Sequence, residues 1–323
     1  MRAVTVREPG DPDVLQLSEL PDPVAGPGEV IVSIAAAGVN RADLQQRIGV
    51  YAPPPGASPI IGLECSGEIA ELGPDVDRWQ VGDPCVALLA GGGYAEQVAV
   101  PAGQVLAPPD GIELITAGGL MEVSATVTSN LAAARLAAGE TFLVHGGAGG
   151  IGTFAIQYAR AVGATVIATA GSAEKVQHCR TVGADLAVSY RDDWPAAVAD
   201  FTQGRGVDVI LDNMGAKYLK ANTGALAADG RLIVIGLQGG RRETLDLGAL
   251  LAKRASISAT SLRSRPIEQK SAICRQVAER VWPMFTDGTI KPAPETRLPL
   301  AEVVAAHTQL ESGDNIGKIL LLP

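Results

Sequence analysis

The sequence is poor in aromatic residues. Phe, Trp and Tyr make up 4% of its 323 residues, whereas 47% are hydrophobic and 19% are charged. A chain with this balance is globular, and with so few rings its core has to be built mainly from Ala, Val, Leu and Ile. No set of neighbouring aromatic residues is available for stacking on nucleobases.

Cysteine and histidine are also scarce, with four and three residues. The cysteines are far apart and form no C-x-x-C pair, which indicates buried or idle thiols rather than a disulfide framework or a structural zinc. The histidines match neither a catalytic triad nor a metal spacing, so we interpret them as structural or surface residues. These residues are Cys65, Cys85, Cys179 and Cys274, and His145, His178 and His307.

Positive charge is in deficit, because the formal net charge is -9. Nucleic-acid binding needs a cationic face that displaces phosphate counterions, so the charge argues against a nucleic-acid partner. No stretch reaches the ~18 uninterrupted apolar residues of a membrane span. The start, M-R-A-V-T-V-R-E-P-G, is charged and lacks the apolar core of a signal peptide. We therefore expect a cytoplasmic location and no membrane partner.

What the sequence does contain is a two-part organisation, as its length suggests. Up to about residue 115, short strand-like runs such as V-I-V-S-I from Val30 are broken by Gly and Pro, which is typical of an irregular β domain or distorted barrel. From about residue 120, strands such as V-I-A-T from Val166 alternate with helical segments, which indicates βαβ units around a parallel sheet. The pattern predicts an α/β fold with helices over 218–227, 266–285 and 301–310, and a last strand over 316–322.

The run H-G-G-A-G-G-I-G, which starts at His145, contains the pattern G-x-G-x-x-G between a predicted strand and a predicted helix. In this context the first glycine allows a tight turn, the second lets the backbone approach a pyrophosphate, and the third lets helix and strand pack closely. The helix N-terminus adds amide donors and a positive dipole end. We therefore predict a dinucleotide cradle formed by Gly147, Ala148, Gly149, Gly150, Ile151 and Gly152.

The residues after the second strand of this unit favour NADPH over NADH. An NAD site has an acidic residue some 20 positions after the glycines, but Gly171 and Ser172 stand there. Ser172 could donate to a 2'-phosphate, Lys175 could pair with it, and Tyr190 could lie against the adenosine end. Glu174 works against this assignment, because it adds a negative charge to the same turn.

Several motifs together resemble the medium-chain dehydrogenase/reductase superfamily over essentially the whole chain. They are G-V-N-R-A-D from Gly38, G-L-E-C-S-G from Gly62, V-G-D from Val81 and I-G-K-I-L-L from Ile316. Further runs, N-R-A-D-L-Q-Q-R-I-G-V-Y from Asn40 and T-S-L-R-S-R from Thr260, are similar to the zinc-independent, zeta-crystallin-type quinone oxidoreductases, in particular the branch induced by a tumour suppressor in animals. The resemblance implies a GroES-like catalytic domain of residues 1–119 and 264–323 and a Rossmann domain of residues 120–263.

The resemblance also implies that no metal is bound. Zinc alcohol dehydrogenases of this superfamily carry a Cys and a Gly-His-Glu whose Cys and His bind the catalytic metal, and this sequence has Asn40 and Leu63 at those places. Neither residue ligates zinc as thiolate or imidazole does, and Cys65 alone does not rebuild a site that needs three protein ligands. We interpret G-L-E-C-S-G as a packing turn and Glu64 as a structural acid.

By the same resemblance the catalytic residues are Asn40, Tyr51 and Thr126, which line the acceptor pocket or contact the nicotinamide amide. Gly236, Leu262 and Lys318 are expected near the nicotinamide half of the cofactor. A proline run after Tyr51 keeps its loop rigid. Its ring is expected to contact quinone or nicotinamide and its hydroxyl to donate to the developing oxyanion, although a purely packing role is the alternative.

The implied activity is a homodimeric, NADPH-dependent quinone reductase that works without metal. A quinone accepts hydride without Lewis-acid help, so the site has to position the reactants and exclude water. Two alternatives stay open: an NADPH-dependent reductase of activated C=C bonds in enoyl or alkenal substrates, and a non-catalytic NADPH-binding protein. For the homodimer we expect pairing through the edge strand at residues 257–260, which would otherwise be left unpaired.

Overall fold

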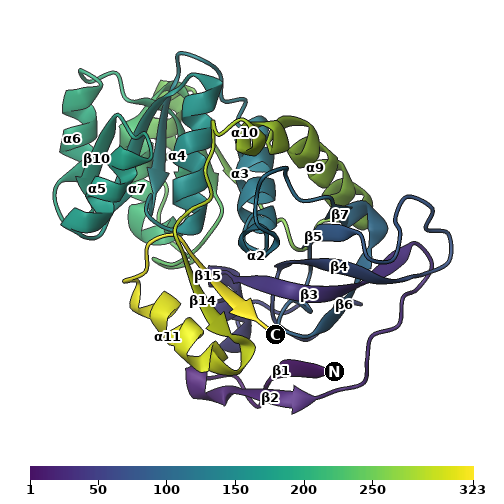
Figure 1. Cartoon of the computed structure of the whole chain (residues 1–323). Helices are drawn as coiled ribbons and strands as arrows, with labels where there is room; N and C mark the ends of the chain where they lie inside the picture. The colour runs from purple at the N-terminus through teal and green to yellow at the C-terminus, as the bar shows by residue number, and fades with distance from the viewer. The chain divides into compact units, whose positions relative to one another are not determined.

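The computed structural model describes residues 1–323. It divides into two compact units, which we call unit 1 (Met1–Ala125 with Leu262–Pro323) and unit 2 (Thr126–Ser261). Figure 1 labels the elements of both units along the chain. No helix is both long enough and apolar enough to cross a membrane.

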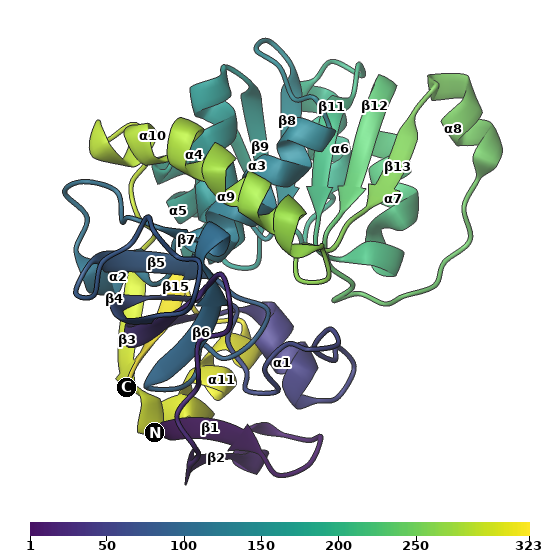
Figure 2. The same ribbon diagram turned by 90° about the vertical axis from the view of Figure 1, so that its right-hand side faces the viewer.

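Unit 2 contains a six-stranded parallel sheet with the strand order β10-β9-β8-β11-β12-β13. Numbered within the unit this order is 3-2-1-4-5-6, the doubly wound order of dinucleotide-binding domains, and Figure 2 shows most of these strands side by side. The strands are β8 (Thr141–His145), β9 (Thr165–Ala170), β10 (Leu186–Ser189), β11 (Val207–Asp212), β12 (Leu226–Val234) and β13 (Ser256–Ala259).

Capping residues mark the ends of two helices of unit 2. α4 (Gly150–Val162) follows the glycine run and ends at Gly163, whose positive φ of 93° suits a residue without a Cβ. The Ser172 side chain caps α5 (Ala173–Thr181) by accepting from the backbone amide of Lys175. α4 packs on β8 and β9, and α5 packs on β9 and β10. The remaining helices are α6 (Trp194–Phe201), η3 (Gly215–Tyr218), α7 (Leu219–Ala225) and α8 (Leu247–Lys253), while α3 (Met121–Ala133) crosses the boundary between the units.

Unit 1 is built on a seven-stranded sheet in the order β14-β15-β3-β4-β5-β7, with β6 also paired to β3. Its core consists mostly of Val, Ile, Leu and Ala, as the scarcity of aromatics predicts. The strands are β3 (Glu29–Val39), β4 (Glu64–Leu72), β5 (Pro84–Leu88), β6 (Gln97–Pro101), β7 (Val105–Leu106), β14 (Glu295–Pro299) and β15 (Lys318–Leu322). The α-helices are α1 (Arg41–Arg47), α2 (Leu114–Ala117), α9 (Ile267–Arg280), α10 (Trp282–Thr286) and α11 (Val303–Ser312).

Three expectations about local structure were wrong. The run from Gly62 to Gly67 is not a packing turn, because β4 already begins at Glu64 and Cys65 pairs with Ala37 of β3. The helix predicted over 218–227 ends at Ala225, because β12 begins at the next residue. The helix predicted over 266–285 is divided into α9 and α10.

The N-terminal hairpin of β1 (Arg2–Val6) and β2 (Leu15–Glu19) has no counterpart among the predicted strands. Its two strands pair antiparallel with each other, and the short helix η1 (Pro12–Val14) lies between them.

Candidate functional site

Two of the predicted cradle glycines are required by packing inside unit 2. A Cβ on Gly147 would lie 2.7 Å from Cys179 Sγ and 2.9 Å from Ala168 Cβ. A Cβ on Gly152 would lie 2.3 Å from the Gly146 carbonyl oxygen. Both distances are far below van der Waals contact, so these glycines let strand, loop and helix approach one another closely.

Gly149 is different, because its surroundings in the chain are open. A Cβ there would meet only the Gly146 carbonyl oxygen, at 3.7 Å. Gly149 also directly precedes α4, whose first-turn amides have no acceptor within the helix itself. Unpaired amides at the positive end of a 13-residue helix form a cradle for an anion, and the open side of Gly149 gives access to it.

Asn213 is a residue of this region that the sequence analysis did not identify. It follows β11, and its side-chain amide nitrogen would lie 2.8 Å from a Cβ on Gly146. Its Oδ1 atom is buried and has no hydrogen-bond partner. Gly236 packs against the same residue, since a Cβ on Gly236 would lie 2.8 Å from the Asn213 carbonyl oxygen. The position of Asn213 directly after a strand of the parallel sheet was the available sequence signal.

The predicted adenosine-side residues come together around the end of β9. A Cβ on Gly171 would lie 2.4 Å from the Tyr190 hydroxyl oxygen, so the ring covers this glycine. The backbone amide of Tyr190 donates to the carbonyl of Ala170 at 2.9 Å. Ser172 Oγ accepts from the Lys175 amide at 3.3 Å and thereby fixes the first turn of α5. Gly171, Ser172, Lys175 and Tyr190 therefore form one surface.

The histidines of unit 2 are engaged inside the fold. His145 is buried between Trp194 and Tyr218, and its two ring nitrogens contact Thr169 Oγ1 at 3.0 Å and Asn222 Oδ1 at 2.7 Å. Burial lowers the pKa of His145 to about 4, so it is neutral at pH 7. His178 similarly contacts the Thr153 hydroxyl at 2.9 Å.

In unit 1, Asn40, Glu64 and Lys318 form a buried polar cluster. The Lys318 ammonium donates to Glu64 Oε1 at 2.5 Å, to Asn40 Oδ1 at 2.8 Å and to the Val39 carbonyl at 3.4 Å. Asn40 in turn donates to Glu64 Oε1 at 2.9 Å. Lys318 is 7% exposed and Glu64 is fully buried, so their opposite charges balance each other away from water.

The surrounding backbone supports this cluster. The other Glu64 oxygen, Oε2, accepts from the backbone amide of Glu122 at 2.9 Å. A Cβ on Gly38 would lie 2.3 Å from Glu64 Oε1, so glycine is needed there for the carboxylate to fit. Lys318 has acceptors for its ammonium within unit 1, and its expected contact with a cofactor stays a prediction.

A second buried chain of polar groups begins one turn beyond Asn40, at Asp43. Asp43 Oδ2 accepts from the Tyr94 hydroxyl at 2.9 Å, and Tyr94 contacts His307 Nε2 at 3.3 Å. Arg47 lies 3.4 Å from the other ring nitrogen of His307. Because arginine only donates, Nδ1 of His307 accepts and Nε2 carries the proton. This series of hydrogen-bonded groups ends at the guanidinium of Arg47, which takes up no proton. The series therefore orients Asp43 and does not conduct protons.

Burial raises the pKa of Asp43 to about 6, against the opposing effect of the hydrogen bonds from Asn40 and Tyr94. The same burial lowers the pKa of His307 to about 3, helped by the charge of Arg47. Asp43 Oδ1 is buried without a partner. Within this series of hydrogen-bonded groups, the carboxyl of Asp43 is therefore the one that changes charge closest to neutral pH.

Tyr51 lies in the loop after α1, and Arg263 holds that loop. The guanidinium carbon is 5.2 Å from the centre of the Tyr51 ring, and Nη1 donates to the Tyr51 carbonyl at 3.2 Å. Thr126 lies in α3 and its carbonyl accepts from Asn130 at 2.7 Å, while Leu262 is 9% exposed in unit 1.

The donor set for a metal does not fit. No group of three or more His, Cys, Asp or Glu side chains is arranged to hold an ion. All four cysteines are buried free thiols, and burial raises the pKa of Cys85, Cys179 and Cys274 to about 12, so these three are protonated. Asn40, which stands where the zinc relatives carry a cysteine ligand, is hydrogen-bonded to the Lys318 and Glu64 side chains.

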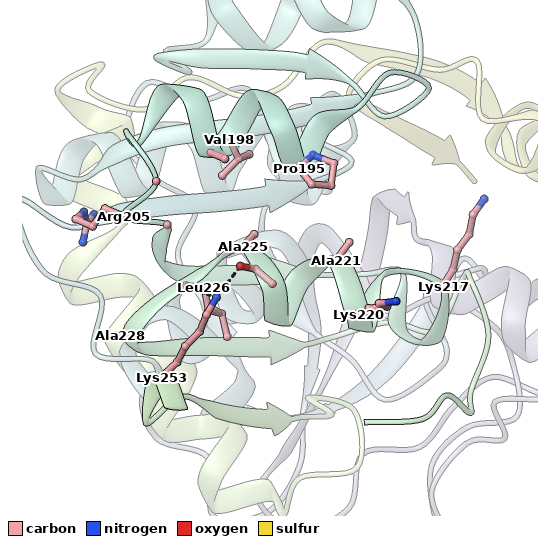
Figure 3. A pocket seen from close by; sticks show the side chains of 14 residues that line it. Pro195, Val198, Arg205, Lys217, Lys220, Ala221, Ala225, Leu226, Ala228 and Lys253 are labelled. Carbon is pink, nitrogen blue, oxygen red and sulfur yellow. Dashed lines mark hydrogen bonds between the residues drawn. The ribbon is translucent and has the colours of Figure 1, made fainter. Parts of the chain in front are cut away.

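A groove in unit 2 runs between α6 and α7 and has a volume of about 620 Å³ (Figure 3). Gly206 and Leu226 in its lining stand at the amino ends of β11 and β12, whereas the glycine loop follows the carboxyl end of β8. Lys253 in the groove donates to three carbonyls around the end of α7, and Arg205 pairs with Asp208. The groove is therefore a different place from the anion cradle, and two of its cations have structural partners.

Family models match both parts of the chain. One, described as an alcohol dehydrogenase GroES-like domain, matches residues 26–110, and one described as a zinc-binding dehydrogenase matches residues 150–279. The second description names a metal for which the donor set described above does not fit.

Similar proteins cover the whole chain. A quinone oxidoreductase of Pseudomonas aeruginosa is 31% identical over 97% of both chains, and a probable quinone oxidoreductase of Schizosaccharomyces pombe is 32% identical over 99% of this chain and 96% of its own. The crystal structure of Escherichia coli quinone oxidoreductase complexed with NADPH is 29% identical, covers 100% of both chains and has a TM-score of 0.88.

Two proteins named as other kinds of reductase are also similar. A 2-haloacrylate reductase of a Burkholderia species is 28% identical over 99% of this chain and 98% of its own. The structure of the CurK enoyl reductase is 25% identical with a TM-score of 0.88 and covers 99% of this chain and 98% of its own.

Proposed function

Because the chain belongs to the zinc-independent quinone oxidoreductase family of the medium-chain dehydrogenases/reductases, we propose that it is an NADPH-dependent quinone reductase. The observation that carries the proposal is the glycine loop. The helix N-terminus that follows it, the open side of Gly149 and the buried, unpartnered Oδ1 of Asn213 are features that a bound dinucleotide would complete.

NADPH, when bound, supplies the hydride. In unit 2 the residues Gly147–Gly152 would hold its pyrophosphate and Gly236 would pack near its nicotinamide half. Lys175 and Ser172 would bind the 2'-phosphate at the start of α5, with Tyr190 against the adenosine. The support for this assignment is that these residues form one surface and that no acidic residue stands at the end of β9, where a ribose of NADH would be bound.

We propose that Asn40 and Tyr51 of unit 1 contact the acceptor, and that Thr126 of unit 2 contacts the nicotinamide amide. Asn40 is held rigidly by Lys318 and Glu64, so it would act as a fixed wall of the acceptor site. The Tyr51 hydroxyl would donate to the acceptor oxygen that gains charge. A quinone needs no Lewis acid for this step, which agrees with a donor set unsuited to zinc.

The test of this function is the rate of NADPH oxidation against a panel of acceptors in the presence of a chelator. We expect ortho- and para-quinones to be reduced, NADPH to be preferred over NADH, and the chelator to have no effect. Tyr51→Phe should lower kcat/KM for quinones by about tenfold, the size of one lost hydrogen bond in the transition state. Stoichiometric zinc that is needed for turnover would contradict the proposal.

The second function to which the relatives point is reduction of an activated C=C bond, as the names of the 2-haloacrylate and CurK enoyl reductases state for those proteins. Enones, acrylates and crotonyl thioesters therefore belong in the same acceptor panel. Higher kcat/KM for these than for quinones would assign that activity instead. Tight NADPH binding without oxidation by any acceptor would leave the non-catalytic alternative.

We also propose that the protein is a homodimer formed through β13. This strand lies at the edge of the sheet and pairs only with β12. In the neighbouring α8, Leu247 and Leu251 are 70% and 80% exposed and one turn apart, so they offer an apolar cover for a second copy. Sedimentation equilibrium should give a dimer, and Leu251→Glu should shift it towards monomer.

A further inference from the structure

Arg263 is a buried arginine whose guanidinium joins three separate segments of unit 1. The residue is 4% exposed. Its nitrogens donate to the carbonyls of Ala90 and Tyr51 and to the side-chain oxygen of Gln46, at 2.8, 3.2 and 2.7 Å. Ala90 follows β5, Gln46 lies in α1, and Tyr51 lies in the loop after α1. Because a guanidinium presents its N–H groups in a rigid plane, three bonds to different segments fix these segments relative to one another.

The loop that carries Tyr51 is connected to this guanidinium near both of its ends. Near the start, Arg263 binds the Tyr51 carbonyl. Near the end, the carbonyl of Pro59 accepts from the side-chain nitrogen of Gln46 at 2.8 Å, and the oxygen of the same amide accepts from Arg263. Three consecutive prolines, at 53–55, restrict the backbone between these points. The loop is therefore a fixed part of unit 1.

The guanidinium also lies over the Tyr51 ring. Its carbon is 5.2 Å from the ring centre, which is within the range of a cation–π contact. Arg263 thus holds both the backbone and the side chain of the same residue. Because Arg263 is buried and Tyr51 is partly exposed, the guanidinium covers the ring from the protein side. The exposed part of the ring is on the side away from Arg263.

An aromatic ring that is held in one orientation discriminates between ligands by shape. Offset stacking stabilises a pair of flat rings beyond the area that they bury, whereas an acyclic ligand has no ring to stack. A ring whose orientation is set before binding also loses less conformational entropy when the ligand arrives. The exposed side of the Tyr51 ring is therefore suited to a flat ring.

We propose that Arg263 is a positioning residue that fixes the Tyr51 ring as a stacking surface and thereby selects acceptors with a planar ring. This rests on the proposed function in one respect, that Tyr51 contacts the acceptor. The selection favours quinones over acyclic enones and acrylates. The nicotinamide of the cofactor is the other flat ring of the reaction, and the experiment separates the two.

The first measurement needs no turnover. Binding of 2-naphthol and of 2-decalol to the NADP⁺-loaded protein is measured by calorimetry, because the two alcohols share a carbon skeleton and only 2-naphthol is flat. We expect 2-naphthol to bind about fivefold more tightly, as one stacked aromatic pair allows. Tyr51→Leu should abolish this preference, whereas Tyr51→Phe, which keeps the ring, should retain it.

The same two probes test Arg263. Arg263→Met should reduce the preference to about twofold or less, because the ring loses its fixed orientation. Arg263→Lys keeps the buried charge and loses the planar guanidinium, so it tests the same point if Arg263→Met does not fold. Arg275→Met, which changes an exposed arginine of α9, is the control and should leave the preference unchanged.

The second measurement compares kcat/KM for 1,4-naphthoquinone and for the acyclic 3-penten-2-one. The ratio of the two should fall about fivefold in Arg263→Met and in Tyr51→Leu, while the KM for NADPH stays constant. The double variant should show no further fall, because Arg263 acts through Tyr51.

Equal binding of the two alcohols to wild type, or a preference that survives in Tyr51→Leu or in the Arg263 variants, overturns the proposal. A rise in the KM for NADPH with an unchanged ratio of acceptors also overturns it and assigns the Tyr51 ring to the nicotinamide. If wild type reduces no acceptor, the proposed function fails, while the binding result still decides whether Arg263 fixes a stacking surface.

Discussion

Lys318 and Lys270 are both buried lysines of unit 1, but their surroundings differ. The Lys318 ammonium has a carboxylate, an amide and a carbonyl as acceptors, all between 2.5 and 3.4 Å. Lys270 forms no ion pair, and the charges of Arg263 and Glu122 act on it with opposite sign. The charge of Lys318 is compensated by a direct ion pair with Glu64, whereas Lys270 has no direct ion pair.

The comparison teaches that burial of a charge does not by itself indicate function. Lys318 and Glu64 stabilise each other and hold Asn40, so their effect is on the geometry of the site. Arg263 and Lys270 are buried without an ion pair, so removal of either charge should cost less stability than removal of the Lys318 charge. The experiments below test this difference, beginning with the largest expected effect.

Lys318→Met should break the balanced cluster. It leaves the Glu64 carboxylate buried without its cation, which costs about 3–5 kcal/mol of unfolding free energy. The double variant Glu64→Met/Lys318→Met removes both charges and should recover most of the loss. Urea unfolding of the three proteins measures this, and a loss below about 1 kcal/mol in the single variant would show that the pair is not balanced as described.

Asp43→Asn should change how stability depends on pH. The pKa of Asp43 is raised to about 6 in the folded protein, so the folded state holds the proton more strongly than the unfolded state, whose pKa is near 3.8. Stability from this group therefore falls as pH rises from about 4 to 6, by up to about 3 kcal/mol. The variant should lack this fall, while the exposed control Asp200→Asn should keep it. Parallel pH profiles for Asp43→Asn and wild type would contradict the expectation.

Arg263→Lys keeps the positive charge but loses the planar guanidinium that donates to Ala90, Tyr51 and Gln46 together. The Tyr51 loop should become less ordered, and the KM for the acceptor should rise about tenfold with little change in the KM for NADPH. Steady-state kinetics measure both constants. Arg275→Lys, an exposed change on α9, is the control, and equal effects of the two variants would exclude a positioning role.

Lys270→Met should have the smallest effect on stability, and of opposite sign to that of Lys318→Met. Removing an unpartnered buried ammonium is expected to stabilise the fold by about 1 kcal/mol. The lowered pKa of Lys270 means that the unfolded state binds the proton more strongly, so stability rises as pH increases towards 10.5. The variant should show less of this rise in urea unfolding at pH 7 and pH 10. A loss of stability like that of Lys318→Met would remove the difference between the two lysines.

Much of unit 2 was predictable, because its signals are local. The glycine pattern lies between a strand and a helix that are adjacent in sequence, and the close packing predicted for Gly152 follows from that neighbourhood. Asn213 was missed because no motif marks it. Its importance depends on β11 lying next to β8, a pairing of distant segments.

Less of the polar site in unit 1 was predictable. Glu64 was expected in a turn, but the strand pairing of β4 with β3 and β5 determines its conformation. Its partner Lys318 is 254 residues away in sequence, and α9 shows no local signal that Lys270 would be buried. Tertiary packing decides whether charged residues that are far apart in the sequence form an ion pair.

The sequence by itself determined the α/β class, the position of the nucleotide loop and the absence of thiol and imidazole ligands where zinc relatives have them. These follow from local periodicity and from the identity of single residues, which folding does not change. Only the tertiary structure decided which buried charges are balanced, because the energy of a charge depends on distances to groups from other segments. For this reason Lys318 is an internal partner of Glu64, whereas Lys270 forms no ion pair.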